Sequence, residues 1–112
     1  MNRVKKEVNV LRAKDNIKVD MPLKEAFNHC KNILEENEFN LKQEDAEKGI
    51  LKASKSLSWD SFGENIFVEI EALEDQKSLV KITSKCKFPL QFFDWGKNNE
   101  NVNTITEELQ KL

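Results

Sequence analysis

Two neighbouring stretches decide the fold, IFVEIEA at positions 66–72 and LVKITSKC at positions 79–86. In both stretches apolar and polar residues alternate, which is the pattern of a β-strand that buries one face. The polar segment 74–77 between them is too short for a crossover connection, so we expect the two strands to pair antiparallel. One face of the resulting sheet is apolar and has to be covered by other elements.

Two further stretches have the spacing of amphipathic helices. The first follows Met21-Pro22, and its apolar residues recur at intervals of three and four from about 22 to 37. The second begins at the asparagines near 98 and places Val102, Ile105 and Leu109 on one side. We expect both helices to cover the apolar face of the sheet. The apolar positions of the first helix are Leu23, Ala26, Phe27, Cys30, Ile33 and Leu34.

The remaining strands have weaker patterns. Apolar residues in 8–19 predict a first strand with a break near Asp15-Asn16, and alternation in 39–43 and 50–57 predicts a hairpin whose Gly49 suits a positive φ. The predicted order is β-α-β-β-β-β-α. The fold class is therefore α+β, a two-layer sandwich with an antiparallel sheet and two helices on one face. This order resembles the TATA-binding-protein-like fold, and also a shortened Bet v 1-like helix-grip.

Length and composition limit the classes of protein. The 112 residues predict a single α+β domain over 1–112, with 1–7 as the one candidate for a disordered end. The net charge of −2 favours neither nucleic acid nor an anionic membrane as a partner. No stretch approaches the roughly 18 apolar residues of a membrane span, and no apolar region follows the basic start. We therefore expect a cytoplasmic protein, and its abundant lysine and missing tyrosine indicate an AT-rich bacterial genome.

Signals for catalysis are weak. His29 is the only histidine, and it lies on the flank of the first predicted helix, four residues after Glu25. Cys30 and Cys86 both fall on apolar faces, which fits buried thiols in a reducing compartment better than a disulfide framework, while a bridge between spatial neighbours stays open. No metal-binding, phosphate-loop or hydrolase motif is present in the sequence, so we expect no enzyme activity, no cofactor and no metal.

The polar face of the sheet carries charges of both signs. Opposite charges on neighbouring strands contribute about 0.2–1 kcal/mol for each pair. A platform for single-stranded nucleic acid would alternate aromatic residues with the lysines, and only Phe67 satisfies this requirement. We therefore expect a solvated, charge-paired face and no nucleic-acid partner. The expected partners are Glu69 and Glu71 with Lys52, Lys81 and Lys85.

Six of the nine aromatic residues lie in two irregular segments, 58–64 and 88–98, which we call the aromatic segments. The first segment enters the strand at 66–72 and the second leaves the strand at 79–86, so both are expected at the same end of the sheet. They form either a lid over the core or a contact site for a ligand or partner. The candidate contact residues are Trp59, Phe62, Glu64, Phe92, Asp94, Trp95 and Lys97.

The aromatic segments contain S-W-D-S-F-G-E at 58–64 and D-W-G-K-N at 94–98, followed by Asn101. These motifs resemble those of a family of small uncharacterised bacterial domains, which carry a Ser-aromatic-Gly-Glu loop and a D-W-G-K-N segment at the start of the last helix. The resemblance covers about 17–112, and Asp60-Ser61 is an insertion relative to the family's shorter loop. It implies no established activity.

The chemistry of these motifs also predicts structural roles. Gly96 allows a tight bend into the last helix, and Asp94 or Asn98 can cap the free N–H groups of that helix. Glu64 is expected to pair with Lys97 if the two aromatic segments touch. Trp95 is expected to pack over the edge of the sheet.

These patterns favour a non-enzymatic binding or interaction module that uses the aromatic segments. The alternative is a small carrier of an apolar ligand, with a cavity between the helices and the curved sheet, although a chain of this length has a modest core. The expected partner is thus a protein or a small apolar ligand, and no membrane. The oligomeric state stays open, since an edge strand can pair with a second copy.

Overall fold

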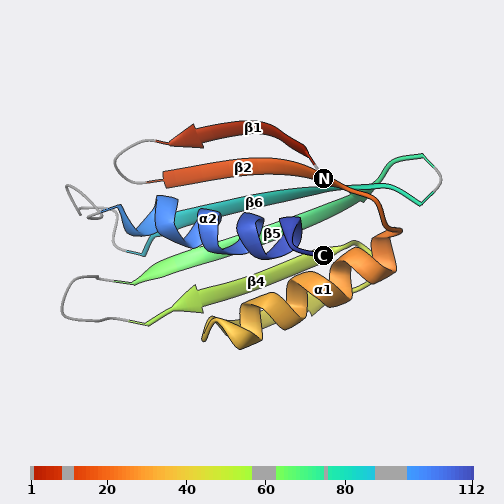
Figure 1. Ribbon diagram of the computed structural model, residues 1–112. Helices are drawn as coiled ribbons and strands as arrows, with labels where there is room; N and C mark the ends of the chain where they lie inside the picture. The colour runs from red at the N-terminus through yellow and green to blue at the C-terminus, as the bar shows by residue number, and fades with distance from the viewer. Residues whose placement is uncertain (1, 9–11, 57–62, 75, 88–95) are drawn as a thin grey trace.

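The computed structural model describes residues 2–8, 12–56, 63–74, 76–87 and 96–112. In these residues six strands and two helices follow one another in the order β1-β2-α1-β3-β4-β5-β6-α2 (Figure 1). The strands are β1 Asn2–Val8, β2 Arg12–Val19, β3 Asn40–Asp45, β4 Ile50–Lys55, β5 Glu64–Ala72 and β6 Ser78–Cys86. The helices are α1 Leu23–Glu36 and α2 Lys97–Gln110.

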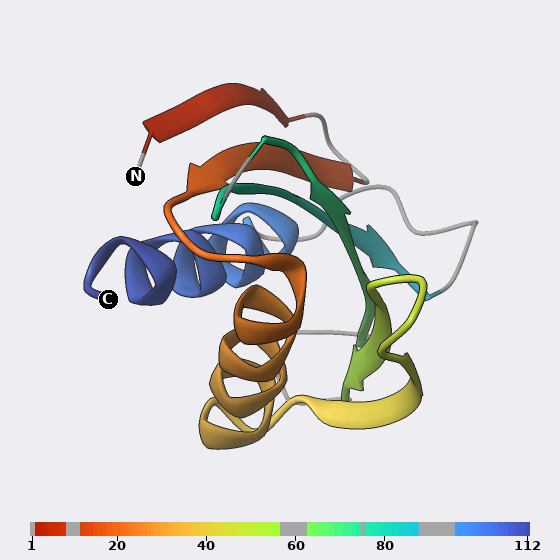
Figure 2. The same ribbon diagram turned by 90° about the vertical axis from the view of Figure 1, so that its right-hand side faces the viewer.

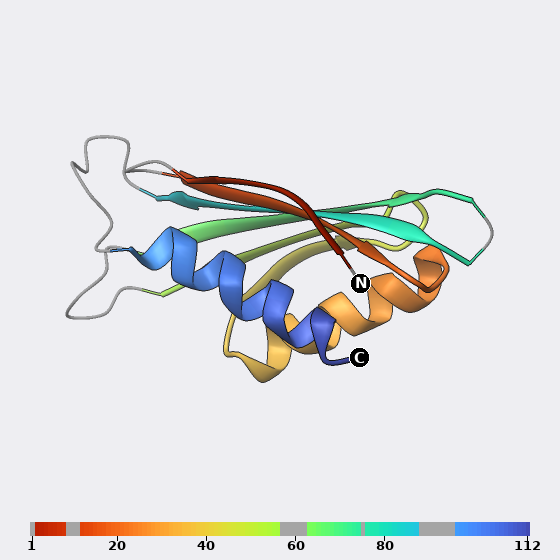
Figure 3. The same ribbon diagram turned by 45° about the horizontal axis from the view of Figure 1, so that its top comes forward.

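The strands form one antiparallel sheet in the spatial order β1-β2-β6-β5-β4-β3. Strand β2 pairs with β6, so the N-terminal and C-terminal parts of the chain meet in the middle of the sheet. Both helices lie on the same side of the sheet, which curves around them (Figures 2 and 3). Helix α2 packs against β2 and β6, and α1 packs against β3, β4 and β5. The predicted two-layer α+β sandwich is confirmed.

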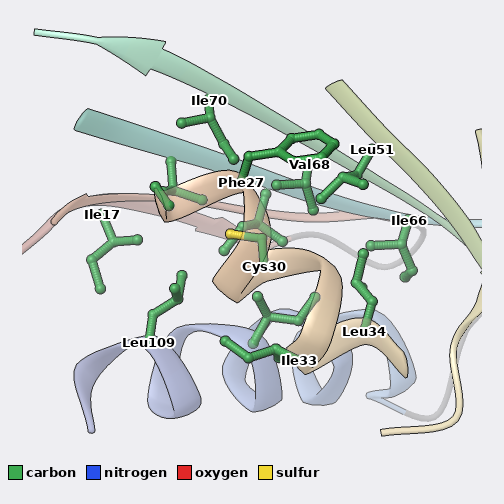
Figure 4. Packing of buried hydrophobic residues seen from close by; sticks show 14 of the residues in the cluster. Ile17, Phe27, Cys30, Ile33, Leu34, Leu51, Ile66, Val68, Ile70 and Leu109 are labelled. Carbon is green, nitrogen blue, oxygen red and sulfur yellow. The ribbon is translucent and has the colours of Figure 1, made fainter. Parts of the chain in front are cut away.

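The core lies between the helices and the sheet. Alternate residues of the strands point into it, for example Ile66, Val68 and Ile70 of β5, as the alternating sequence predicts. Phe27 and Leu34 of α1 pack onto the same layer (Figure 4). Every predicted apolar position of α1 except Leu23 is buried, and Leu23 packs against the core from its margin. In α2, the predicted residues Val102, Ile105 and Leu109 are also buried.

The N-terminal part of the chain differs from the prediction of one broken strand. Residues 2–8, the candidate disordered end, form β1, and this edge strand pairs with β2. Lys6 Nζ donates a hydrogen bond of 2.7 Å to Asn103 Oδ1 of α2, which ties the edge strand to the helix layer. The predicted break near Asp15-Asn16 is wrong, because both residues lie inside β2 and pair with β6. Asp15 points to the helix side and is fully buried, which a polar residue in a strand rarely is.

The predicted turn at Gly49 and the predicted end of the first helix are both confirmed. Gly49 has φ +71° in the β3–β4 turn, and its carbonyl accepts a 2.7 Å hydrogen bond from the Ile70 backbone N–H. A Cβ at this position would collide with the Ile70 carbonyl oxygen, so glycine is required for two independent reasons. Helix α1 ends at Glu36, and Asn37, the expected stop, is its C-cap residue. The Asn37 side-chain amide donates to the Ile33 carbonyl.

Candidate functional site

The two aromatic segments are anchored side by side. The strand residues that adjoin them are direct partners, because Glu64 at the start of β5 lies opposite Cys86 at the end of β6. One residue further out, the Lys87 backbone N–H donates a 3.1 Å hydrogen bond to the Gly63 carbonyl. The expectation that both segments leave the same end of the sheet is therefore confirmed at their anchors.

Five of the seven predicted contact residues lie outside the described residues. The other two are Glu64 and Lys97. The Glu64 side chain lies in the interior, with 1% of its surface exposed. Lys97 is the first residue of α2, and its Nζ lies 3.2 Å from Glu100 Oε2 of the same helix. The predicted contact residues outside the described part are Trp59, Phe62, Phe92, Asp94 and Trp95.

A buried chain of polar side chains joins β5, β6 and α2 at this end of the sheet. Asn101 Nδ2 donates to Glu64 Oε1 at 2.8 Å and to Ser84 Oγ at 3.2 Å. Ser84 Oγ in turn donates to Asn98 Oδ1 at 2.8 Å, and Asn98 Nδ2 donates to Cys86 Sγ at 3.3 Å. We call these five residues the anchor network, and its carboxyl, amide and hydroxyl groups are almost completely shielded from solvent.

The anchor network changes two predicted roles. The start of α2 has no side-chain cap among the described residues, and Gly96 provides the bend instead, with φ +77°. The Asn98 side chain points to the sheet, so its predicted capping role is wrong, and the alternative cap Asp94 lies outside the described residues. Glu64 and Lys97, which are predicted to pair if the aromatic segments touch, each have a described partner elsewhere: Glu64 bonds with Asn101, and Lys97 pairs with Glu100 of its own helix.

Sequence reasoning missed the anchor network, although one signal for it exists. Asn98 and Asn101 are three residues apart, and Asn101 directly precedes the buried Val102. Residues three and four apart share one face of a helix. Two asparagines on the buried face of a helix need hydrogen-bond partners, because an unsatisfied amide in the interior costs about 1–3 kcal/mol.

The two thiols and the one histidine are the remaining candidates for reactive groups. Neither Cys30 nor Cys86 forms a disulfide bond. Cys30 is buried in the core, and burial raises the pKa of its thiol to about 12, so it stays protonated at neutral pH. His29 Nε2 lies 3.9 Å from Glu25 Oε1, which is the helical pair expected from their spacing. Among the described residues, no group of three or more His, Cys, Asp or Glu side chains is placed to hold a metal ion.

The sheet face away from the helices is only partly charge-paired. Lys81 Nζ lies 3.2 Å from Glu71 Oε2 and 3.7 Å from Glu69 Oε1, as expected. These carboxylates raise the pKa of Lys81, chiefly through the hydrogen bond from Glu71. Lys52 is different, since its Nζ lies 5.6 Å from the centre of the Phe67 ring.

The strand register explains this difference. It places Lys85 opposite Asn65, so Lys85 does not lie across from a carboxylate. Lys52 and Lys85 both border a hollow of about 450 Å³ on this face. The residues that line the hollow are Lys42, Lys52, Ala53, Asn65, Ile66, Phe67, Thr83 and Lys85.

Comparison with known proteins identifies a shared fold. No family model and no curated protein matches the sequence. Among solved structures, the chain is similar to the crystal structure of Ara h 8.0201, with a TM-score of 0.59 and 9% sequence identity. The match covers 92% of this chain and 94% of that one. None of the helices in the described residues has the length and apolar character needed to cross a membrane. The likeness to Ara h 8.0201 therefore extends over nearly the whole of both chains, and at this identity it is a likeness of fold.

Proposed function

We propose that the chain is a non-enzymatic binding module of the bacterial cytoplasm, and that the aromatic segments 58–64 and 88–98 form its contact site. The anchor network is the observation that carries this proposal. It holds the last residue of one segment, Glu64, to the helix that follows the other segment. Such a network orients the ends of both segments together, and preorganised loops lose less entropy on binding. The D-W-G-K-N motif at 94–98 supports membership in the family of small bacterial domains that it resembles.

Aromatic composition favours a contact site at the two segments. Twenty apolar residues of the described part are buried in the core, and two of them are aromatic. Six of the nine aromatic residues of the chain belong to the aromatic segments, and in this proposal they face a partner. Tryptophan is one of the residue types that dominate the energetics of protein contacts, so Trp59 and Trp95 are the principal contact residues of the proposal.

Stability measurements on Trp95→Ala separate a contact site from a lid. A contact residue on the surface leaves the free energy of unfolding within about 1 kcal/mol of wild type. A tryptophan packed in a lid loses about 3–5 kcal/mol on truncation. Leu73→Ala is the matched control, because Leu73 is 40% exposed and lies at the opposite end of β5. Loss of several kcal/mol in Trp95→Ala but not in Leu73→Ala would refute the contact site.

The contact itself is tested by quantitative affinity capture from the source cells. We expect the wild-type chain and Leu73→Ala to retain the same proteins, and the double variant Trp59→Ala/Trp95→Ala to lose them. The double variant must also show the wild-type circular dichroism spectrum, so that loss of binding is not loss of fold. Equal retention by all three chains would contradict the proposed contact site.

A second candidate function is a carrier for a small apolar ligand held between the helices and the sheet. The fold shared with Ara h 8.0201 favours it, together with the resemblance of the element order to a Bet v 1-like helix-grip. Native mass spectrometry of gently purified protein tests it. Extra mass that disappears on denaturation supports the carrier, whereas the bare chain mass of 13.0 kDa counts against it.

A further inference from the structure

A hollow lies on the open face of the sheet, on the opposite side of the sheet from the helices. Strands β3, β4, β5 and β6 all contribute to it. Phe67 lies between Lys52 of β4 and Thr83 of β6, which are its direct partners in the sheet. Its ring is half-buried, so it forms the apolar part of the hollow. Lys42 borders the hollow from β3, and Lys85 borders it from β6.

Positive charge is concentrated at the hollow. Lys42, Lys52 and Lys85 border it, and within the described residues none of the three forms an ion pair. The two carboxylates that β5 carries on this face lie further along the strand, where Glu69 and Glu71 both pair with Lys81. The chain as a whole has a net charge of −2, so this local excess is not a consequence of composition. Like charges that converge on one hollow repel one another, and a bound anion removes that repulsion.

The other lining groups select the shape of the anion. Phe67 contributes an aromatic ring, with Lys52 Nζ over it at 5.6 Å from the ring centre, and the Asn65 amide and the Thr83 hydroxyl are groups that form hydrogen bonds. The volume of about 450 Å³ lies in the range of small-molecule sites. A nucleic-acid strand is held by a series of aromatic residues, one for each successive base, whereas the described residues that line this hollow include one aromatic ring. The lining therefore fits a single ring with an attached anion.

We propose that the hollow binds one small molecule that carries a planar ring and a phosphate group, as a nucleoside monophosphate does. The ring stacks on Phe67 and the phosphate lies among the ammonium groups of Lys42, Lys52 and Lys85. Binding requires no movement of the helices, since the hollow lies on the other side of the sheet. This proposal does not rest on the contact site proposed at the aromatic segments.

Chemical-shift titration with AMP tests the site in the full chain. We expect saturable changes at the amides of β4, β5 and β6 around the hollow, and weaker binding of adenosine alone and of inorganic phosphate alone. The triple variant Lys42→Gln/Lys52→Gln/Lys85→Gln should weaken AMP binding at least about tenfold, because it removes the charged donors. Raising the salt concentration should weaken binding by the wild-type chain, since partly exposed charges are screened.

The matched control is the triple variant Lys24→Gln/Lys48→Gln/Lys77→Gln, which has the same net charge and changes exposed lysines outside the hollow. It should bind AMP within about twofold of wild type, because distant exposed charges are screened. Phe67→Leu gives a second readout, and it should weaken binding of AMP while leaving the weak binding of phosphate unchanged.

Three outcomes would overturn the proposal. The first is an absence of saturable shifts at millimolar AMP, and the second is equal weakening of AMP binding by both triple variants. The third is an affinity for oligothymidylates that exceeds that for AMP and rises with their length. That result would assign the face to a nucleic-acid strand.

Discussion

Truncation of Asn101 to alanine tests the anchor network directly. The variant removes the Nδ2 donor that Glu64 Oε1 and Ser84 Oγ share, at 2.8 and 3.2 Å. Each buried acceptor that loses its donor costs about 1–3 kcal/mol, so the two acceptors together cost about 2–6 kcal/mol. Ser84 keeps its bond with Asn98, which favours the lower half of this range, about 2–4 kcal/mol. Alanine gains about 0.5 kcal/mol in helix propensity, so we expect a net loss of about 1.5–3.5 kcal/mol. Urea unfolding measures this loss, and the midpoint of thermal unfolding should fall by about 6–14 °C.

The control for this prediction lies two residues away on the same helix. Asn99 Oδ1 is buried and has no hydrogen-bond partner among the described residues. Asn99→Ala therefore removes an unsatisfied group, and we expect it to be neutral or to stabilise the protein by about 0.5 kcal/mol. The reasoning would be refuted if Asn101→Ala unfolded within 0.5 kcal/mol of wild type, about the error of such comparisons. It would equally be refuted if both variants lost the same stability.

Two further predictions concern the turn and the core. Gly49→Ala should lose about 2 kcal/mol or more, because its φ of +71° disfavours a side chain and the new Cβ meets the Ile70 carbonyl oxygen. Urea unfolding checks this, and a variant as stable as wild type would contradict it. At pH 8, a thiol reagent should label Cys86 in the folded protein and reach Cys30 only on unfolding. Because burial raises the pKa of Cys30 from 9.0 to about 12, the unfolded chain loses this proton first as the pH rises. Its contribution to stability is therefore complete below pH 9 and declines between pH 9 and 12, and Cys30→Ala should abolish this part of the pH dependence.

The strands and helices that contact the core could be predicted from the sequence, because their apolar residues repeat with the period of the element. Strand β1 has no such pattern. Its sequence NRVKKEV is mostly polar, and as an edge strand it is held by backbone pairing with β2, which leaves little trace in the residue types. Asp15 misled the prediction in a different way. A polar residue in the middle of a strand pattern indicated a break, but its carboxyl group is buried inside the continuous strand β2.

The sequence could predict which end of the sheet holds the candidate site, but it could not predict the hydrogen bonds of the anchor network. The topology of β5 and β6 places the ends of the aromatic segments together, and topology follows from the short connection between the strands. The partners of Asn98 and Asn101 depend on how α2 docks on β6, which no local pattern encodes. The hollow depends likewise on strand register, which sets Glu69 opposite Lys81 and leaves Lys52 beside Phe67.

The pairing of β2 with β6 has a consequence for synthesis on the ribosome. Residues 20–77 separate these two strands, so β2 is translated long before its partner in the centre of the sheet. Until β6 and α2 emerge, the apolar side of β2, with Ile17 and Val19, has no cover from either element. Long-range pairing of this kind slows folding, and it leaves apolar residues and an unpaired strand edge exposed to other nascent chains. Strand β1 is translated just before β2 and pairs with its outer edge. This pairing protects the backbone groups of that edge of β2 until β6 is made.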